Sequence, residues 1–324
     1  MTSSRDRARS IAVWILATVA LLFFLRMASA LLIPIAVAVL LSYAAEPAVA
    51  SLARWRVPRP FGAAVVLLVV AGAVARGIYA LRDEAAAVLA AVPVAAERLA
   101  AWAGVGDPMA GGSAGVLLQG IGWVLTGAGN FTIVVMLAYF LLVSGDHFKR
   151  RVIETAGDSP KRRLTAGVFD EINLQIQRFL LVQVATSVVV GVATWLVLAW
   201  MQVPQAPIWG VAAGLFNSIP YFGPVIVSGG LLLVGLLQSG DPMVALRMSA
   251  AAMAITSIEG WVLNPLLMGR AERMHVVVVF VGVLLWTWLW GAWGTLLAVP
   301  MLVVIKAVAD HFEPLQPISR LMAR

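Results

Sequence analysis

The sequence predicts an all-α, polytopic membrane protein with about seven or eight spans, two of them interrupted hairpins. Three observations support this fold class. Of the 324 residues, 61% are apolar and 12% are charged, against about 45–50% and about 25% in an average soluble domain. The apolar residues form runs of about 20 residues, the length that crosses a bilayer as a helix. The basic residues collect between these runs, as they do in cytoplasmic loops.

This composition excludes several function classes. A soluble globule cannot bury so much apolar surface, so we exclude a cytosolic enzyme, a nucleic-acid-binding domain and a disordered protein. The formal net charge of +7 fits basic cytoplasmic loops better than nucleic-acid binding. The chain has no cysteine and three scattered histidines, and it lacks the P-loop and H-E-x-x-H motifs. We therefore expect no cofactor, no metal site and no enzyme activity.

The apolar runs are taken in chain order as candidate spans. They are Ile11–Leu25, Leu31–Ala50, Phe61–Leu81, Gly120–Val143, Phe179–Met201, Ile208–Leu237, Val244–Leu263 and Val276–Ile305. The first run follows three arginines and precedes an Ala-Ser-Ala sequence, so it resembles a signal peptide. We favour a retained anchor, because a second apolar run follows almost at once.

The basic residues between the spans predict the orientation. One arrangement places every basic cluster on the cytoplasmic side, including the arginines near the N-terminus, Lys149–Arg151 and Lys161–Arg163. It also makes both termini cytoplasmic. It leaves 82–118 outside, where apolar residues recur at three- and four-residue steps, typical of an amphipathic helix. A similar stripe runs from Phe169 to Phe179 on the inside.

We divide the chain into five units on this basis. They are a three-span unit (1–81), an external amphipathic segment (82–119), a fourth span with a cytoplasmic amphipathic helix (120–178), a transport core (179–310) and a cytoplasmic tail (311–324).

Within the core, two units of opposite orientation each consist of one full span followed by one interrupted segment. Ile208–Leu237 is interrupted by Pro220 and Pro224, and Val276–Ile305 by a Gly-Ala-Trp-Gly turn. Inverted repeats with broken helices are a common transporter design, with substrate near the midplane. A proline leaves a helix carbonyl without its donor, and such carbonyls must be buried in protein or line a wet cavity. A packing kink is the simpler interpretation.

Few polar residues lie inside these apolar stretches. Glu259 is the leading candidate for contact with an ion, a proton or a polar substrate, because an intramembrane carboxylate is costly unless it is paired or wet. The amides can coordinate substrate or only bridge helices. The proposed pathway residues are Gln183, Asn217, Pro220, Gly223, Pro224, Glu259, Asn264 and Pro265.

Five motifs in order resemble a known family. The first two are Leu32–Tyr43 followed by Glu46-Pro47, and the basic loop Trp55–Arg59. The third is the I-P-Y-x-G-P sequence that ends Asn217–Pro224. The fourth is Glu259 with Asn264–Arg270, and the last is Gly291–Pro300. From about Leu31 to Val308 the chain resembles the AI-2E family, whose members are also called PerM-like.

The resemblance implies a bacterial inner-membrane transporter that forms a homo-oligomer, a pentamer, and moves its substrate by an elevator-like shift. It implies two cargo classes, which are autoinducer-2-like polar solutes for export and Na⁺ or Li⁺ exchanged for protons. One departure from the family weakens the cation mechanism, because Asn217 stands where the family often has an acid. The mechanism would then require Glu259 to serve alone. A non-transporting membrane scaffold is the alternative from another class. The sequence names neither the solute, the coupling ion nor the direction.

Overall fold

The computed structural model describes residues 4–103, 128–155, 159–219, 222–268 and 274–311. These residues form helices and no β-strand, which confirms the all-α class. The elements are α1 (Ser4–Met27), α2 (Ser29–Arg54), α3 (Arg59–Ala103), α5 (Ala128–Thr155), α6 (Ser159–Trp200), α7 (Ala206–Phe216), α8 (Phe222–Ser239), α9 (Pro242–Ile258), a π-helix (Glu259–Leu263), α10 (Asn264–Met268) and α11 (Val276–His311).

Several helices are long and apolar enough to cross a membrane, which supports a multi-pass protein. Five meet this criterion within the described ranges: Ser29–Arg54, Arg59–Asp83, Asp170–Trp200, Phe222–Ser239 and Val276–Asp310. Shorter apolar helices cover Ile15–Met27, Phe131–Gly145 and Ala206–Phe216. The exact count of seven or eight spans stays a prediction, and the start of the predicted fourth span lies outside the described residues.

Two segments that we expected as separate amphipathic helices are continuous with spans. Helix α3 runs for 45 residues and includes the first part of the external segment. Helix α6 runs for 42 residues across the predicted boundary at 178/179. No proline or glycine lies between Val168 and Val190, so nothing in the sequence ends the helix there.

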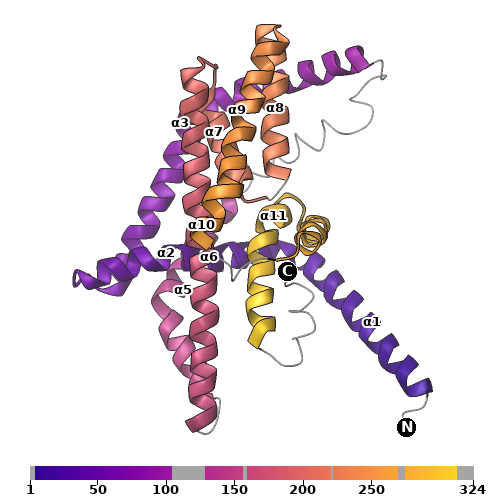
Figure 1. Cartoon of the computed structure of the whole chain (residues 1–324). Helices are drawn as coiled ribbons and strands as arrows, with labels where there is room; N and C mark the ends of the chain where they lie inside the picture. Colours follow the sequence, from indigo (N-terminus) through magenta and orange to yellow (C-terminus); the bar gives the residue numbers. More distant parts are fainter. Residues whose placement is uncertain (1–3, 104–127, 156–158, 220–221, 269–273, 312–324) are drawn as a thin grey trace.

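The second half of α6 forms a four-helix bundle with α7, α8 and α9, which lie around its upper part in Figure 1, while α5 lies beside its lower part. Glycines let α6 and α7 approach closely. A β-carbon on Gly210 would lie 2.6 Å from Trp195 Cβ, and one on Gly214 would lie 2.7 Å from the Ser187 carbonyl oxygen. Small residues at such contacts favour helix association in membranes.

The bundle interior is mostly apolar. Its buried apolar side chains are Val190, Leu198, Ala206, Trp209, Ala213, Val227, Leu231, Val234, Met248 and Ala252. The turn from α8 to α9 is built by Gly240, whose φ is +65°, and by Asp241, which accepts a hydrogen bond from the Met243 backbone N–H at 2.8 Å. Asp241 is thus the N-cap of α9, with Pro242 in the first turn.

Helix α11 is a helical hairpin rather than one straight helix. The chain turns at Gly291, where φ is 61° and ψ is −137°. The two arms pack closely, because a β-carbon on Gly282 would lie 2.5 Å from Leu302 Cδ1 and the hydroxyls of Thr287 and Thr295 are 2.8 Å apart. The interruption predicted at this turn is therefore confirmed.

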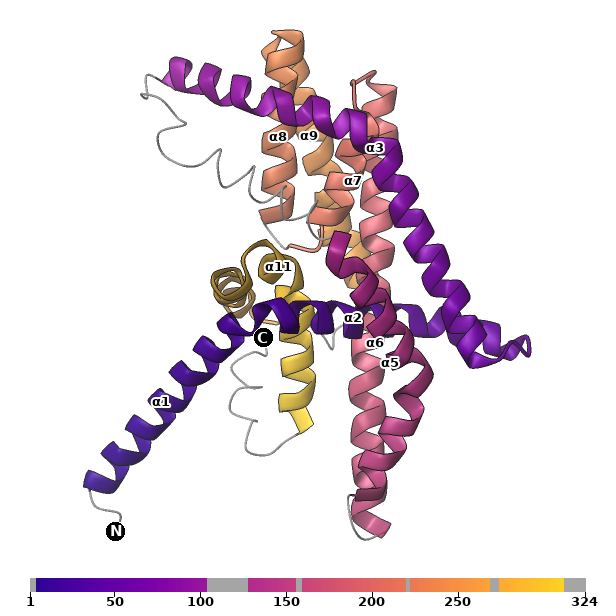
Figure 2. The ribbon, with the colours of Figure 1, turned by 180° about the vertical axis from the view of Figure 1, so that it is seen from behind.

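The two hairpins have different neighbours. The α7–α8 hairpin packs against α6 and α9, whereas α11 packs chiefly against α6 and α2. Figure 2 shows α11 beside α2, away from the upper part of the four-helix bundle. The inverted repeat therefore stays a prediction.

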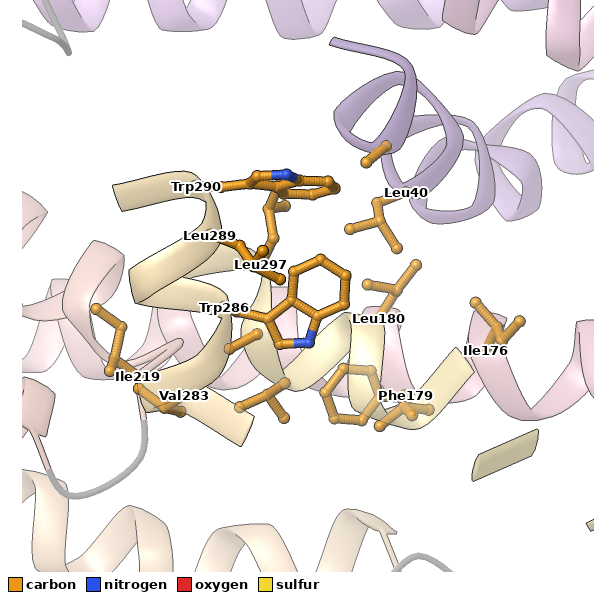
Figure 3. Packing of buried hydrophobic residues seen from close by; sticks show 14 residues of the cluster. Leu40, Ile176, Phe179, Leu180, Ile219, Val283, Trp286, Leu289, Trp290 and Leu297 are labelled. Atoms are coloured by element: carbon orange, nitrogen blue, oxygen red, sulfur yellow. The ribbon is translucent and has the colours of Figure 1, made fainter. Parts of the chain in front are cut away.

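A tryptophan-rich cluster links α11 to α2, α6 and the tip of the first hairpin (Figure 3). The rings of Trp286 and Trp290 are 4.8 Å apart, and Trp290 Nε1 donates to the Leu25 carbonyl at 3.0 Å. Ile219, which is 2% exposed, belongs to the same cluster. Burial of Ile219 therefore anchors the hairpin tip, and with it the neighbouring Asn217.

Polar contacts tie α2 to its neighbours. Arg59 of α3 donates to the Glu46 carboxylate at 2.6 Å and to the Leu142 carbonyl at 3.1 Å, so it joins α2, α3 and α5. The Tyr43 hydroxyl donates to Asn173 Oδ1 on α6 at 2.6 Å. These bonds surround a further apolar cluster that α2 shares with α3 and α5.

Candidate substrate and ion site

The tip of the first hairpin positions the first candidate residue. Helix α7 ends at Phe216, and Asn217 follows as its C-cap. The Ile219 backbone N–H donates to the Phe216 carbonyl at 2.9 Å, and the Gly223 N–H donates to the Ile219 carbonyl at 2.9 Å. The tip is thus a hydrogen-bonded turn, and Asn217 is held where α7 and α8 meet.

Gly223 is required by this turn. A β-carbon there would collide with the Phe216 carbonyl oxygen. Pro220 has no N–H to give to the Phe216 carbonyl, and the Ile219 N–H donates to that carbonyl instead. Pro224 lies in the first turn of α8, and Pro220 lies outside the described residues.

Glu259 lies where α9 widens into a π-helix. Glu259 is 8% exposed and is the first residue of the π-helix Glu259–Leu263. The Asn264 N–H bonds back to the Glu259 carbonyl, five residues earlier. Pro265, which has no N–H to give to Trp261, follows directly, so the wider turn fits a missing donor. Single π-turns inside helices are frequent at functional sites.

Three helical segments meet at Glu259. Its carboxyl group interacts with the side chains of Asn217, from the hairpin tip, and of Thr186, from α6. Neither interaction has the geometry of a full hydrogen bond: Thr186 Oγ1 donates to the Gln183 carbonyl at 3.2 Å, and Asn217 Nδ2 is buried without a hydrogen-bond partner. The cluster of Glu259, Asn217 and Thr186 therefore has hydrogen-bonding capacity left for a ligand.

Asn264, which directly follows the π-helix, adds a further unused polar atom. Its Oδ1 is buried and has no hydrogen-bond partner. Segments around it contact α6, where Arg178 donates to the Leu267 carbonyl at 3.5 Å. A buried amide oxygen without a partner is costly in a protein interior. The carboxyl oxygens of Glu259 and the amide groups of two asparagines thus offer both acceptors and donors.

Gln183 does not join the Glu259 cluster. Its Nε2 donates to Ser187 Oγ at 3.4 Å, and both residues line an open groove of about 480 Å³ between α6 and α7. Valines, glycines and Trp195 make up most of the remaining lining. This groove is largely apolar, so the polar chemistry lies in the cluster of Glu259, Asn217 and Thr186.

The sequence interpretation missed Thr186. It sits in an apolar run, where a threonine can bond to its own helix and carry no further role. A signal was present in the spacing: Thr186, Val190, Thr194 and Leu198 recur every four residues, and all four are at most 1% exposed. That stripe marks the buried face of α6 and places Thr186 on it.

The described residues contain no group of three His, Asp or Glu side chains that could hold a metal ion. Glu259 is the carboxyl of the cluster, and its neighbours are neutral amide and hydroxyl groups. This donor set suits a polar solute, or a cation whose single counter-charge is Glu259.

Comparisons with known proteins all identify transport proteins. A family model described as "AI-2E family transporter" matches residues 91–313, which include α5 to α11. The chain is 30% identical over 148 residues to the AI-2 transport protein TqsA of Escherichia coli (strain K12), covering 46% of this chain and 43% of TqsA. It is 28% identical over 186 residues to PerM of the same strain, covering 57% and 52%.

A further relative is YhhT of Escherichia coli (strain K12), 31% identical over 183 residues, which covers 56% of this chain and 51% of YhhT. The matches thus span about half the length of these relatives.

Proposed function

Because the chain belongs to the AI-2E transporter family, we propose that it is a secondary transporter that exports a small polar solute, such as autoinducer-2, across the bacterial inner membrane. Support comes from the family match, which includes the helices that build the candidate site. The name of the relative TqsA, an AI-2 transport protein, makes autoinducer-2 the first solute to test. The proposal includes cytoplasmic termini, since that orientation places every basic cluster inside.

One observation carries the proposal. Glu259 is 8% exposed, at a π-helix, and faces an asparagine on a hairpin tip. A carboxyl group inside a membrane helix costs a few kcal/mol unless it is paired or wet. The end of α7 and the start of α8 add partial charges that polar groups can use. We propose that solute binds between Asn217, Pro220, Gly223 and Pro224 on one side and Glu259, Asn264 and Pro265 on the other.

Flux in proteoliposomes tests this function. Solutes that accumulate in a deletion strain relative to its parent supply the candidate cargo. We expect saturable flux with the wild-type protein, strong loss in Glu259→Ala and Asn217→Ala, and normal flux in Glu171→Gln, which removes an exposed acid outside the bundle. No saturable flux of any candidate solute with folded wild-type protein would contradict a transport function and favour the scaffold alternative.

A second candidate is Na⁺(Li⁺)/H⁺ antiport, favoured by the buried carboxyl group. In that case Glu259 must exchange a proton during each cycle. Glu259→Gln keeps the shape of the side chain and its ability to form hydrogen bonds but removes the titratable group, so we expect it to abolish cation flux driven by a pH gradient. Normal antiport in Glu259→Gln rules this version out, and solute flux without a pH dependence favours the solute exporter.

We further propose that the protein works as a homo-oligomer, a pentamer by resemblance to the family. Native mass spectrometry of the protein released from lipid nanodiscs measures the subunit number. A monomer that still transports solute would contradict this part of the proposal.

A further inference from the structure

The interior of the four-helix bundle contains a second set of unused polar atoms. Thr194 Oγ1, Trp209 Nε1 and Ser228 Oγ are buried and have no hydrogen-bond partner. Their residues are 0%, 9% and 4% exposed. None of the three belongs to the cluster around Glu259.

These hydroxyls differ from others in the same protein. Thr256, Ser239 and Thr287 each donate to a carbonyl four residues earlier in their own helix, at 3.0, 2.7 and 2.6 Å. Such back-bonding is the usual way for a hydroxyl to be satisfied in an apolar helix. Thr194 and Ser228 do not use it, so their hydroxyls stay available to a ligand.

Close contacts between the helices place these three residues in one layer of the bundle. Thr194 precedes Trp195, whose Cβ would lie 2.6 Å from a β-carbon on Gly210, the residue after Trp209. The Trp209 ring in turn would lie 2.7 Å from a β-carbon on Gly230, two residues beyond Ser228. The three residues therefore lie at similar heights along the bundle.

This layer lies along the same face of α6 as the Glu259 site. Thr186, which contacts Glu259, is two turns before Thr194, or about 12 Å along the helix. Val190, which is fully buried, lies between them on the same face, and Ala213 and Val227 belong to the same apolar cluster. The bundle interior thus has two polar layers separated by an apolar one.

The donor set of the second layer decides what it can bind. Trp209 Nε1–H only donates, while the two hydroxyls donate and accept. Among the buried side chains of the described bundle, Glu259 is the one carboxyl, and it lies in the other layer. Since this layer contains an indole N–H donor and no carboxyl group to balance a positive charge, it disfavours a cation and favours a neutral oxygen atom as the acceptor.

We propose that Thr194, Trp209 and Ser228 form a second binding layer for a neutral oxygen-bearing ligand, either a hydroxyl group of the cargo or the water that takes its place. The cargo then passes through the bundle interior, between the two polar layers, and not along the apolar groove between α6 and α7. This inference rests on the proposed transport function for the cargo, but the water-binding part is independent of it.

The test compares near-isosteric variants in solute-free detergent buffer, with water as the probe. We would measure melting temperatures of wild type, Thr194→Val, Ser228→Ala and the double variant. Because a bound water links the two hydroxyls, each single variant should have a melting temperature about 2–4 °C below that of the wild type. The decrease in the double variant should be smaller than the sum of the two single decreases. Thr287→Val, whose hydroxyl bonds to a carbonyl and to Thr295, calibrates the loss of an ordinary hydrogen bond.

A dry layer gives the opposite result. If no ligand is bound, Thr194→Val removes a hydroxyl that is buried without a partner, so the melting temperature stays the same or rises. That result overturns the proposal whatever the protein transports. Additive single effects would likewise overturn a shared ligand.

Flux in proteoliposomes tests the part played by the cargo. We expect about a fivefold loss in Thr194→Val relative to Thr287→Val, the effect of one lost hydrogen bond. Unchanged flux with coupled melting temperatures would show a water site that the cargo does not use, and would overturn the proposed route. Coupled melting temperatures with no flux in wild type would overturn the transport function and support the hydrated layer.

Discussion

Replacing Gly210 by alanine tests the close packing of α6 and α7, which supports the hairpin carrying Asn217. A β-carbon at this position would lie 2.6 Å from Trp195 Cβ, 2.7 Å from the Gly191 carbonyl oxygen and 3.2 Å from Trp195 Cα. These are backbone atoms or atoms bound directly to the backbone, so no side-chain rotation relieves the overlap. The two helices must separate to accept the methyl group.

The magnitude follows from two opposing effects. Overpacking a tight interface costs about 1–3 kcal/mol, and contacts below 3 Å with rigid atoms put Gly210→Ala at the upper end. The gain in helix propensity from glycine to alanine returns about 1 kcal/mol. We therefore expect a net loss of about 2 kcal/mol.

The matched control is Gly229→Ala in α8, where a β-carbon would meet no atom within 4 Å. That variant keeps the propensity gain, so the two alanine variants should differ by about 3 kcal/mol, or about 6–12 °C in melting temperature. Thermal unfolding followed by the fluorescence of the twelve tryptophans measures this difference. Equal melting temperatures for the two variants would refute the packing argument.

Three further substitutions follow from particular contacts. Gly291→Ala should destabilise the folded protein by about 1–3 kcal/mol, because φ is +61° and ψ is −137° at this residue and the cost is purely conformational. An unchanged stability in chemical or thermal unfolding would exclude this backbone conformation at Gly291. Arg59→Ala removes the hydrogen bonds to Glu46 and to the Leu142 carbonyl. We expect a loss of about 1–2 kcal/mol in folding stability, a reduced value because the Arg59 side chain is 33% exposed. Unchanged stability at low salt would mean that the Arg59–Glu46 pair contributes nothing. Trp290→Phe loses one hydrogen bond to a carbonyl of α1, worth about 0.5–1.5 kcal/mol, and faster proteolysis of α1 should accompany it; an unchanged digestion pattern would argue against this anchor.

The sequence predicted the interruptions well because proline and glycine act locally. The turn at Gly291 and the break after Phe216 follow from residues whose backbone preferences need no knowledge of the neighbours. Glu259 was equally visible, because an acid in an apolar run stands out in any context. Glu259 and the two interruptions therefore let the sequence predict one carboxyl group of the candidate site and both hairpins.

The rest depended on packing between helices distant in sequence. Thr186 and Thr194 resemble ordinary helix hydroxyls, and only the structure shows that one faces Glu259 and the other lacks a partner. Gln183 was an equally good candidate by composition but lines the apolar groove. The π-helix at Glu259 also could not be predicted, since a proline such as Pro265 can be accommodated by a kink as well as by a wider turn.

Accessibility to aqueous reagents tests whether the site around Asn217 is wet and open to cargo. The chain suits the method because it has no native cysteine. We would compare Asn217→Cys with Val189→Cys, a residue 51% exposed on the outer face of α6, in native membranes with a small charged methanethiosulfonate reagent. We expect that Asn217→Cys reacts, that cargo slows the reaction, and that Val189→Cys, facing lipid, stays unlabelled. Labelling of Val189→Cys with none at Asn217→Cys would contradict it.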